Sequence, residues 1–208
     1  MSIFRNESTA MTTKSERTST FIIETVAPIF NKKGYAGTSM SDLTEATGLT
    51  KGAIYGNFEN KEDLAIQAFN YNVERLLSKI TNRLEATSSP LQKLFVLTNF
   101  YRFYADYTKD FGGCPLLNTG VDANNQFLQL HEKVKLTVTE LQNIIKQIIT
   151  EGKHKSEIKP YIDADKYSRQ LFSMIEGAVF SATIMQNTDY LKEMMDVIDK
   201  IIITQFKI

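Results

Sequence analysis

Cysteine is almost absent from this 208-residue chain, and the single residue, Cys114, excludes an internal disulfide framework. A lone thiol is typical of a protein in a reducing compartment. Long apolar runs are missing too, since no stretch approaches the roughly 20 residues that a membrane-spanning helix needs. Residues 1–20 also lack the apolar segment of a signal peptide. We therefore expect a cytoplasmic protein without membrane contact, with a disordered Ser/Thr-rich tail over residues 1–16.

An excess of charge of either sign is also missing, because 24 Lys and Arg residues balance 24 Asp and Glu residues. Residues 1–61 carry seven basic and six acidic side chains, a surplus of one. The chain therefore has no broad positive field with which to attract a polyanion. Any contact with nucleic acid must come from the local placement of a few side chains.

Histidine is scarce, and the 23 residues that separate His131 from His154 are not a metal-ligand spacing. The sequence has no nucleophile elbow and no glycine loop that could cradle a phosphate. We therefore predict no enzyme active site, no metal and no cofactor.

Prolines and glycines are few, four and ten, and the segments between them repeat their apolar residues at helical spacing. This spacing predicts an all-α chain of about nine helices. The first, over residues 20–33, is expected to bend at Pro28 and to end at a left-handed cap on Gly34. The other helices are predicted over residues 39–47, 50–58, 61–86, 88–108, a short stretch after Pro115, 125–152, 164–186 and 190–206.

The segment from Thr38 to Phe58 has the pattern of two short helices joined by a tight turn. Gly48 permits the turn, and Thr50 offers a hydroxyl N-cap for the second helix. The next residues are small enough to let the backbone approach a groove floor, and Lys51 can reach guanine acceptors or a phosphate. We interpret the segment as a helix-turn-helix whose second helix enters the DNA major groove.

A dense set of motif positions surrounds this segment: Tyr35, Thr38-Ser39, Gly48, Thr50-Lys51-Gly52-Ala53-Ile54-Tyr55, Phe58 and Lys61-Glu62. Together they resemble the DNA-binding domain of the TetR (tetracycline-repressor) family over residues 21–69. The resemblance implies a homodimer on double-stranded operator DNA, with a helix-turn-helix domain over residues 17–64 and an effector-binding and dimerisation domain over residues 65–208. It also implies DNA contacts from Ser39, Thr50, Lys51, Gly52, Ala53, Tyr55, Asn57 and Lys61.

The chain departs from the family pattern at three positions. Ser41 stands where many members carry Arg, Asn57 where His is common, and Gly56 where a bulkier residue is usual. Each change removes charge or reach, so the operator sequence cannot be carried over from the family.

Aromatic residues form a stripe at helical spacing in residues 100–111. Such a stripe is typical of a packed core, but it can also wall an apolar pocket to which tyrosine hydroxyls add polar groups. Cys114 is expected to be a buried, inert thiol beside it. The candidate effector pocket comprises Phe100, Phe103, Tyr104, Tyr107, Phe111, Cys114, Leu117, Phe127 and Met174.

Two apolar stripes near the C-terminus suggest a four-helix bundle between two copies of the chain. The predicted dimer interface comprises Leu171, Ala178, Ala182, Met185, Met194, Ile198 and Ile201.

The sequence thus favours a dimeric regulator, a repressor by family analogy, released from palindromic DNA by a small apolar or aromatic effector. Two alternatives stay open. One is a DNA-binding regulator that needs no ligand, and the other is a helical ligand-binding or scaffold protein that has lost DNA binding.

Overall fold

Helices make up nearly all of the structure, a computed structural model that describes residues 13–124 and 127–208. Within these ranges the chain forms ten α-helices and no strand, which confirms the all-α prediction. None of these helices is both long and apolar enough to cross a membrane. Their bounds are α1 Lys14–Gly37, α2 Met40–Thr47, α3 Lys51–Tyr55, α4 Lys61–Ala86, α5 Pro90–Arg102, α6 Tyr104–Thr108, α7 Pro115–Ala123, α8 Leu128–His154, α9 Ala164–Met185 and α10 Asp189–Ile201.

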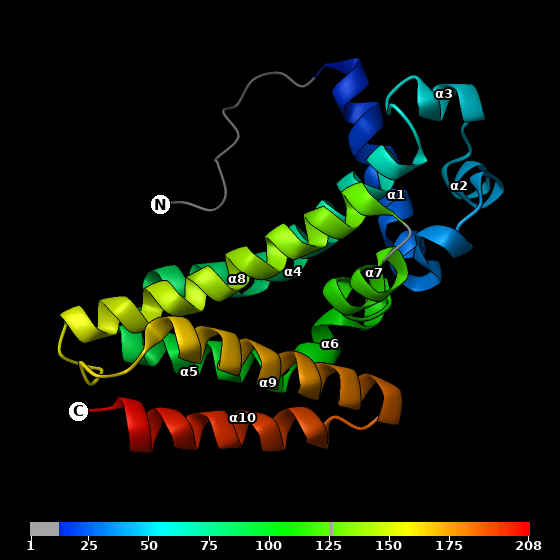
Figure 1. Cartoon of the computed structure of the whole chain (residues 1–208). Helices are drawn as coiled ribbons and strands as arrows, with labels where there is room; N and C mark the ends of the chain where they lie inside the picture. The colour runs from blue at the N-terminus through cyan, green and yellow to red at the C-terminus, as the bar shows by residue number, and fades with distance from the viewer. Residues whose placement is uncertain (1–12, 125–126) are drawn as a thin grey trace.

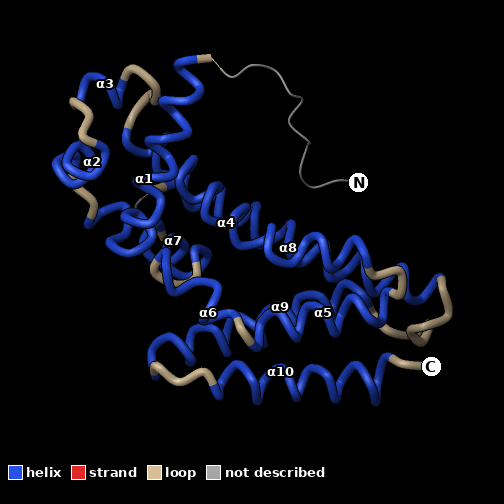
Figure 2. Tube along the Cα trace, turned by 180° about the vertical axis from the view of Figure 1, so that it is seen from behind, coloured by secondary structure: helices blue, strands red, loops and turns tan. Residues whose placement is uncertain are grey.

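The helices divide into a head, α1 to α3, and a body, α4 to α10 (Figure 1). The head lies at one end, and α4 and α8 lead away from it. The helices α5, α9 and α10 lie beneath α4 and α8, as the view from behind also shows (Figure 2). A 3₁₀ turn, Lys109–Phe111, links α6 to α7, and a π-helical turn, Ile202–Phe206, follows α10.

Two buried apolar clusters hold this arrangement together. The body cluster gathers residues of α4, α5, α8, α9 and α10. The head cluster joins Ile22, Leu43 and Ile54 to the first turns of α4, and it also includes Ala123 of α7 and Leu130 of α8. The head core therefore continues into the body, and the predicted division after residue 64 stays a prediction.

The first helix begins earlier than its apolar pattern predicts. Thr13 and Glu16 form a capping box in which Thr13 Oγ1 accepts from the backbone amide of Glu16, so α1 starts at Lys14. The predicted tail was therefore wrong over residues 14–16, while residues 1–12 lie outside the described residues. The backbone of α1 leaves helical geometry at Gly34, and it does not do so at Pro28, where a bend was expected.

Other boundaries move by a few residues. The predicted helix over residues 50–58 ends at Tyr55, and the one over residues 88–108 divides at Phe103 into α5 and α6. Of the start predicted for the next long helix, residues 125 and 126 lie outside the described residues, and α8 begins at Leu128.

Gly34 occupies a backbone conformation that only glycine adopts readily, with φ 74° and ψ 169°. A Cβ at this position would also lie 2.9 Å from the Asp122 carboxylate carbon. The turn at Gly34 therefore requires glycine for both backbone and packing reasons.

We expect Gly34→Ala to lower the free energy of unfolding by about 1–3 kcal/mol, the usual cost of forcing a side chain into this backbone region. Urea denaturation of the purified protein measures it. Gly37→Ala is the matched control, because its Cβ would meet only Lys33 Cβ at 3.8 Å. Equal unfolding midpoints for the two variants would contradict the argument.

Candidate nucleic-acid interface and body cavity

Side-chain caps fix the geometry of the helix pair α2 and α3. Ser39 caps α2 in a reciprocal box with Asp42, and Gly48 closes it in the left-handed conformation at φ 68°. Thr50 then caps α3, where its hydroxyl accepts from the backbone amide of Ala53 at 3.2 Å. The helix pair packs on the head cluster through Leu43, Ile54 and Phe58, which are buried there.

The opposite face of α3 is open. Lys51, Gly52 and Ala53 are exposed, and Tyr55 is 37% exposed. The Lys51 ammonium lies 5.7 Å from the centre of the Tyr55 ring, so the two side chains share one outer surface. A protruding helix with a basic residue in its first turn is the arrangement that groove recognition requires.

Asn57 has a structural partner in addition to any role on DNA. Its side-chain oxygen accepts from Ser19 Oγ at 3.1 Å and from Ser15 Oγ at 3.3 Å. Its amide nitrogen donates to the Ala53 carbonyl at 2.8 Å. Asn57 therefore joins the end of α3 to the beginning of α1.

Lys61 also contacts another part of the chain. Its ammonium donates to the Tyr35 carbonyl at 2.6 Å and lies 4.3 Å from the centre of the Tyr35 ring. Burial lowers the pKa of this ammonium. In this conformation the charge of Lys61 stabilises the end of α1, so a phosphate contact from Lys61 stays a prediction.

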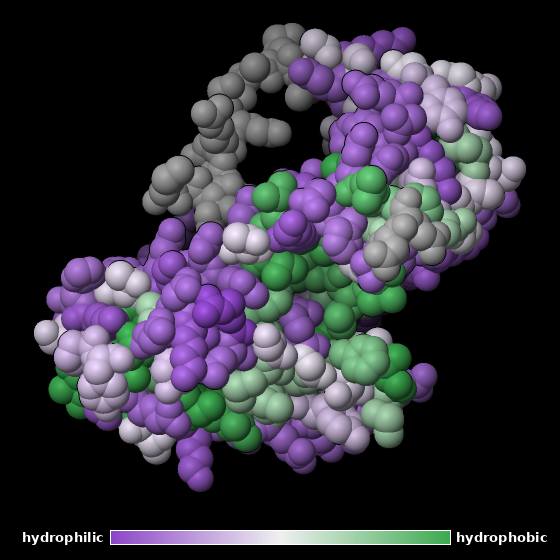
Figure 3. Space-filling model, in the orientation of Figure 1, coloured by the Kyte–Doolittle hydropathy of each residue, from purple (hydrophilic) through white to green (hydrophobic). Residues whose placement is uncertain are grey.

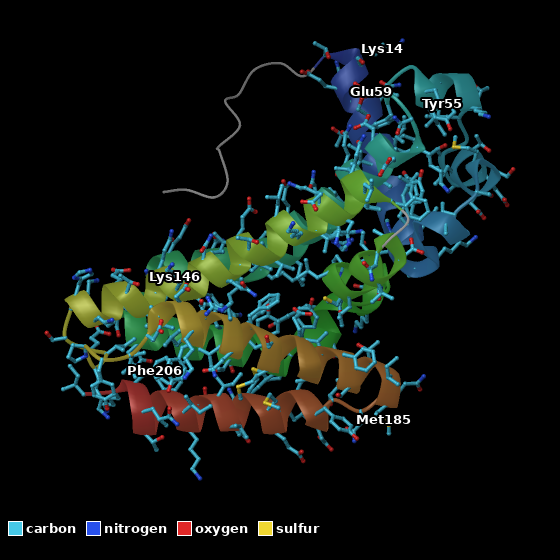
Figure 4. The ribbon with its side chains drawn as sticks, viewed as in Figure 1. Lys14, Tyr55, Glu59, Lys146, Met185 and Phe206 are labelled. Atoms are coloured by element: carbon cyan, nitrogen blue, oxygen red, sulfur yellow. The ribbon has the colours of Figure 1, made fainter. Side chains whose placement is uncertain are left out.

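Sequence reasoning missed two basic residues beside the candidate interface. Lys14 and Arg17 are exposed on the first turns of α1 and line a shallow hollow with Leu49, the residue before the α3 cap. Figure 4 places Lys14 and Tyr55 at the same outer end of the head. The capping box at Thr13 and Glu16 was the signal that could have placed these residues on a helix.

A set of polar contacts, which we call the seam, joins the head to the body through Asn31, Asn118 and Asp122. The buried Asn31 amide donates to the carbonyls of Phe111 at 2.6 Å and Gly113 at 3.0 Å. The Asn118 amide donates in return to the carbonyls of Asn31 and Gly112, both at 2.9 Å.

Asp122 completes the seam after the break at Gly34. One carboxylate oxygen accepts from the backbone amide of Tyr35 at 2.5 Å and from that of Ala36 at 3.4 Å. These two amides have lost their helical acceptors at the break, and the carboxylate replaces them. The last turn of α1 is therefore held by α7 of the body.

The body contains a partly open cavity of about 480 Å³ between α4, α5, α8 and α9. Figure 3 shows apolar side chains gathered in a recess in the middle of one face of the molecule. Polar residues, including Glu85, Lys93 and Glu151, lie at the cavity end farther from the head. Its apolar and aromatic lining is Leu77, Ile80, Leu84, Leu97, Phe100, Tyr101, Leu141, Ile144, Ile145, Ile148, Phe172 and Ile175.

The structure brings only one of the nine predicted pocket residues, Phe100, to the cavity wall. Phe103 is 49% exposed, because the break between α5 and α6 turns its side chain outward. Phe127 instead packs against the Tyr35 ring, with 4.2 Å between ring centres. The others lie in the core or half-buried beside it, outside the lining: Tyr104, Tyr107, Phe111, Cys114, Leu117 and Met174.

The predicted dimer residues divide into two groups. Leu171, Ala178, Ala182 and Ile198 are buried inside the protomer, so their stripe packs α9 and α10 onto the body and cannot be the free face that was expected. Met194 and Ile201 are half-buried and Met185 is 60% exposed.

A more exposed stripe, which keeps Met194 and Ile201 of the predicted set, runs along the outer face of α9 and α10. On α9 it comprises Ser173, Gly177, Phe180 and Ile184, and on α10 Tyr190, Met194, Val197 and Ile201. Phe180 and Ile184 are 54% and 63% exposed.

Comparisons with known proteins agree with the helix-turn-helix geometry. Residues 22–68 match the model of the bacterial regulatory proteins of the tetR family, and residues 90–198 match that of the tetracyclin repressor-like C-terminal domain. The chain belongs to the TetR family. Its head and body are thus those of a TetR-family transcriptional regulator, and this family assignment confirms that the chain is not an enzyme.

Relatives support the same assignment. A TetR-family regulator from Cytophaga hutchinsonii is 37% identical in its crystal structure, with a TM-score of 0.87 over 95% of this chain and 98% of that one. The fatty acid metabolism regulator protein of Bacillus subtilis is 24% identical over 81% of this chain and 84% of its own length. The transcriptional repressor DhaR of a Mycobacterium species is 27% identical over 85% and 88%.

We expect Asn118→Ala to lower the free energy of unfolding by about 1–3 kcal/mol, because it leaves two carbonyls of the seam without a donor. Asn99→Ala on the exposed face of α5 is the matched control and is expected to change stability by less than about 0.5 kcal/mol. Urea denaturation distinguishes them. A seam variant as stable as its control would show that these hydrogen bonds contribute nothing net.

Proposed function

We propose that this TetR-family regulator is a homodimeric repressor that binds palindromic operator DNA and leaves it when a small apolar or aromatic effector occupies the body. The observation that carries DNA binding is the protruding first turn of α3, with Lys51 exposed beyond a buried base of Ile54 and Phe58. Lys14 and Arg17 add positive charge beside it.

The proposed switch connects the cavity to the seam. Phe100 lines the cavity and stacks on Tyr107, with 5.1 Å between ring centres. Tyr107 belongs to α6, and the turn after α6 presents the Phe111 carbonyl that Asn31 binds. An effector that moves Phe100 would therefore move α1, and operator and effector would weaken each other's binding reciprocally.

A regulator that needs no ligand is the second candidate. A body of that kind would have a filled interior, and the cavity of about 480 Å³ counts against it. A protein that has lost DNA binding is the third candidate, and a gel-shift assay with the DNA upstream of the chain's own gene tests it.

The exposed stripe on α9 and α10 supports dimerisation. Its members follow one another at intervals of four, three and four residues on each helix, the spacing of a single helical face. A groove lined by Ser173, Met174 and Ile201 runs between the two helices. Two copies packed through this stripe would form a four-helix bundle and hold two recognition helices roughly 34–36 Å apart, one DNA turn.

We expect Lys51→Ala to weaken operator binding by about tenfold or more, because it removes the basic side chain of the protruding turn. Fluorescence anisotropy with a labelled upstream duplex measures the affinity. Lys192→Ala removes the same charge from α10, far from the head, and should change affinity by less than about twofold. Equal affinities for the two variants would mean that α3 is not the recognition helix.

We expect Phe180→Glu to convert the dimer to monomers at micromolar concentration, because it introduces a charge into the apolar stripe. Light scattering after size-exclusion chromatography reports the mass. Leu136→Glu is the control, since Leu136 is similarly exposed on α8, at 57%. A Phe180→Glu protein that keeps the mass of the wild-type dimer would place the interface elsewhere.

A further inference from the structure

A carboxyl group lies largely buried in the body, behind the wall of the cavity, without a full set of partners. Glu176 of α9 has one oxygen, Oε1, that is inaccessible to solvent and accepts no hydrogen bond from the described residues. Its other oxygen lies 3.9 Å from Cys114 Sγ. None of the salt bridges among residues 13–124 and 127–208 includes Glu176. A buried polar atom without a partner is costly, which suggests that a ligand group supplies one.

Aromatic rings surround this end of the cavity. Tyr101 lines the cavity and stacks on Tyr104, with 5.1 Å between ring centres, and Phe100 packs edge-on against Tyr101 at 5.2 Å. Glu176 follows two further lining residues, Phe172 and Ile175, by four and one positions on α9. The carboxyl therefore lies where α5, α6 and α9 meet, behind the lining residues at the cavity end nearer the head.

This environment favours positive charge. Ring faces attract cations through their quadrupole, and a buried carboxylate without a counter-ion attracts them more strongly. The Lys79 ammonium already lies 5.7 Å from the centre of the neighbouring Tyr107 ring. The charged residues Glu85, Lys93 and Glu151 lie at the far end of the cavity. Lys93 is eight residues before Tyr101 on α5, about 12 Å at the helical rise per residue.

We propose that the effector is an amphipathic organic cation whose apolar or aromatic body occupies the cavity and whose protonated amine passes the lining residue Tyr101 to donate to Glu176 Oε1 beside the rings of Tyr101 and Tyr104. This inference rests on the proposed function, because it names the effector class of the same cavity. The apolar lining holds the body of the molecule. A neutral molecule would satisfy only the hydrogen bond, and an anion would be repelled by the carboxylate.

The protonation of Glu176 makes binding of the amine depend on pH. Burial raises the pKa of Glu176 to about 7, so the carboxyl is partly protonated in the free protein near neutral pH. The groups that face it stay neutral there, because burial also raises the pKa values of Tyr101, Tyr104 and Cys114. A bound ammonium favours the ionised carboxylate, so binding releases a proton, and affinity for the amine rises from pH 6 to pH 8.

Calorimetry with a matched series tests the proposal on the wild-type protein. 4-Phenylbutylamine, 4-phenylbutanol and 4-phenylbutanoic acid share one body and differ in the charge of the head group. We expect the amine to bind at least tenfold more tightly than the alcohol, and the acid to bind most weakly. We also expect titrations in two buffers of different ionisation enthalpy to show proton release with the amine alone. An alcohol as tight as the amine, or an acid tighter than both, would overturn the proposal.

Glu176→Gln tests the residue. The amide keeps the size of the side chain and removes its charge, so we expect amine affinity to fall at least tenfold and alcohol affinity to stay within twofold. Glu193→Gln removes a charge from the exposed face of α10, outside the cavity lining, and is the matched control, expected to leave amine affinity within twofold. If Glu176→Gln weakens both ligands equally, or Glu193→Gln matches its effect, Glu176 does not recognise the cation. If Glu176→Gln does not fold, the ligand series on the wild-type protein tests the proposal by itself.

The test of the cation site can be distinguished from the test of the proposed function. Calorimetry reports whether the amine binds, and anisotropy with the operator duplex reports whether the bound amine releases DNA. Tight, Glu176-dependent binding without release would support the cation site and contradict the switch. Release by a neutral or anionic ligand would support the switch and contradict the cation site.

Discussion

The structure depends on one interaction above all, the pair of hydrogen bonds from the buried Asn31 amide to the carbonyls of Phe111 and Gly113. Asn31 belongs to α1, the helix that supports the DNA-binding pair, and its acceptors belong to the turn before α7. Because an unpaired buried donor is costly, the head moves relative to this turn only if it breaks these bonds at that cost or carries the turn along. Asn118 and Asp122 add further hydrogen bonds across the same boundary. These hydrogen bonds and the head cluster, which extends into α4, α7 and α8, together join the head to the body.

Few positive charges near the helix-turn-helix are free to contact DNA. Lys33 of the head pairs with Asp42 at 2.5 Å, and Lys61, at the start of α4, binds the Tyr35 carbonyl. The Lys33 ammonium holds the pKa of the Asp42 carboxyl well below its usual range. Among the residues that the structure describes, the basic side chains exposed at the outer end are Lys14, Arg17 and Lys51. Such a head provides few phosphate contacts, and binding of two heads to one DNA would compensate by raising the effective concentration of the second.

The features that were predicted best from the sequence are those that depend on short-range interactions. Gly48, Thr50 and Gly34 have short-range roles in turns and caps, so the helix-turn-helix could be located from its residues alone. The pocket and the dimer face were harder, because an apolar stripe has the same spacing whether it meets a core, a cavity or a second chain. The stripe of Leu171, Ala178 and Ala182 packs inside the protomer for this reason. The partners of Lys61 and Glu176 lie far away in sequence, and no spacing rule could identify them.

The central claim is that the seam holds the head at a fixed position on the body. Spin labels on Glu45→Cys, an exposed position on α2, allow the distance between the two heads of the proposed dimer to be measured by double electron–electron resonance, since Cys114 is buried. We predict a narrow distance distribution for the protein with an intact seam and a clearly broader one when Asn118→Ala is added. Equally broad distributions in both proteins, or equally narrow ones, would contradict the account.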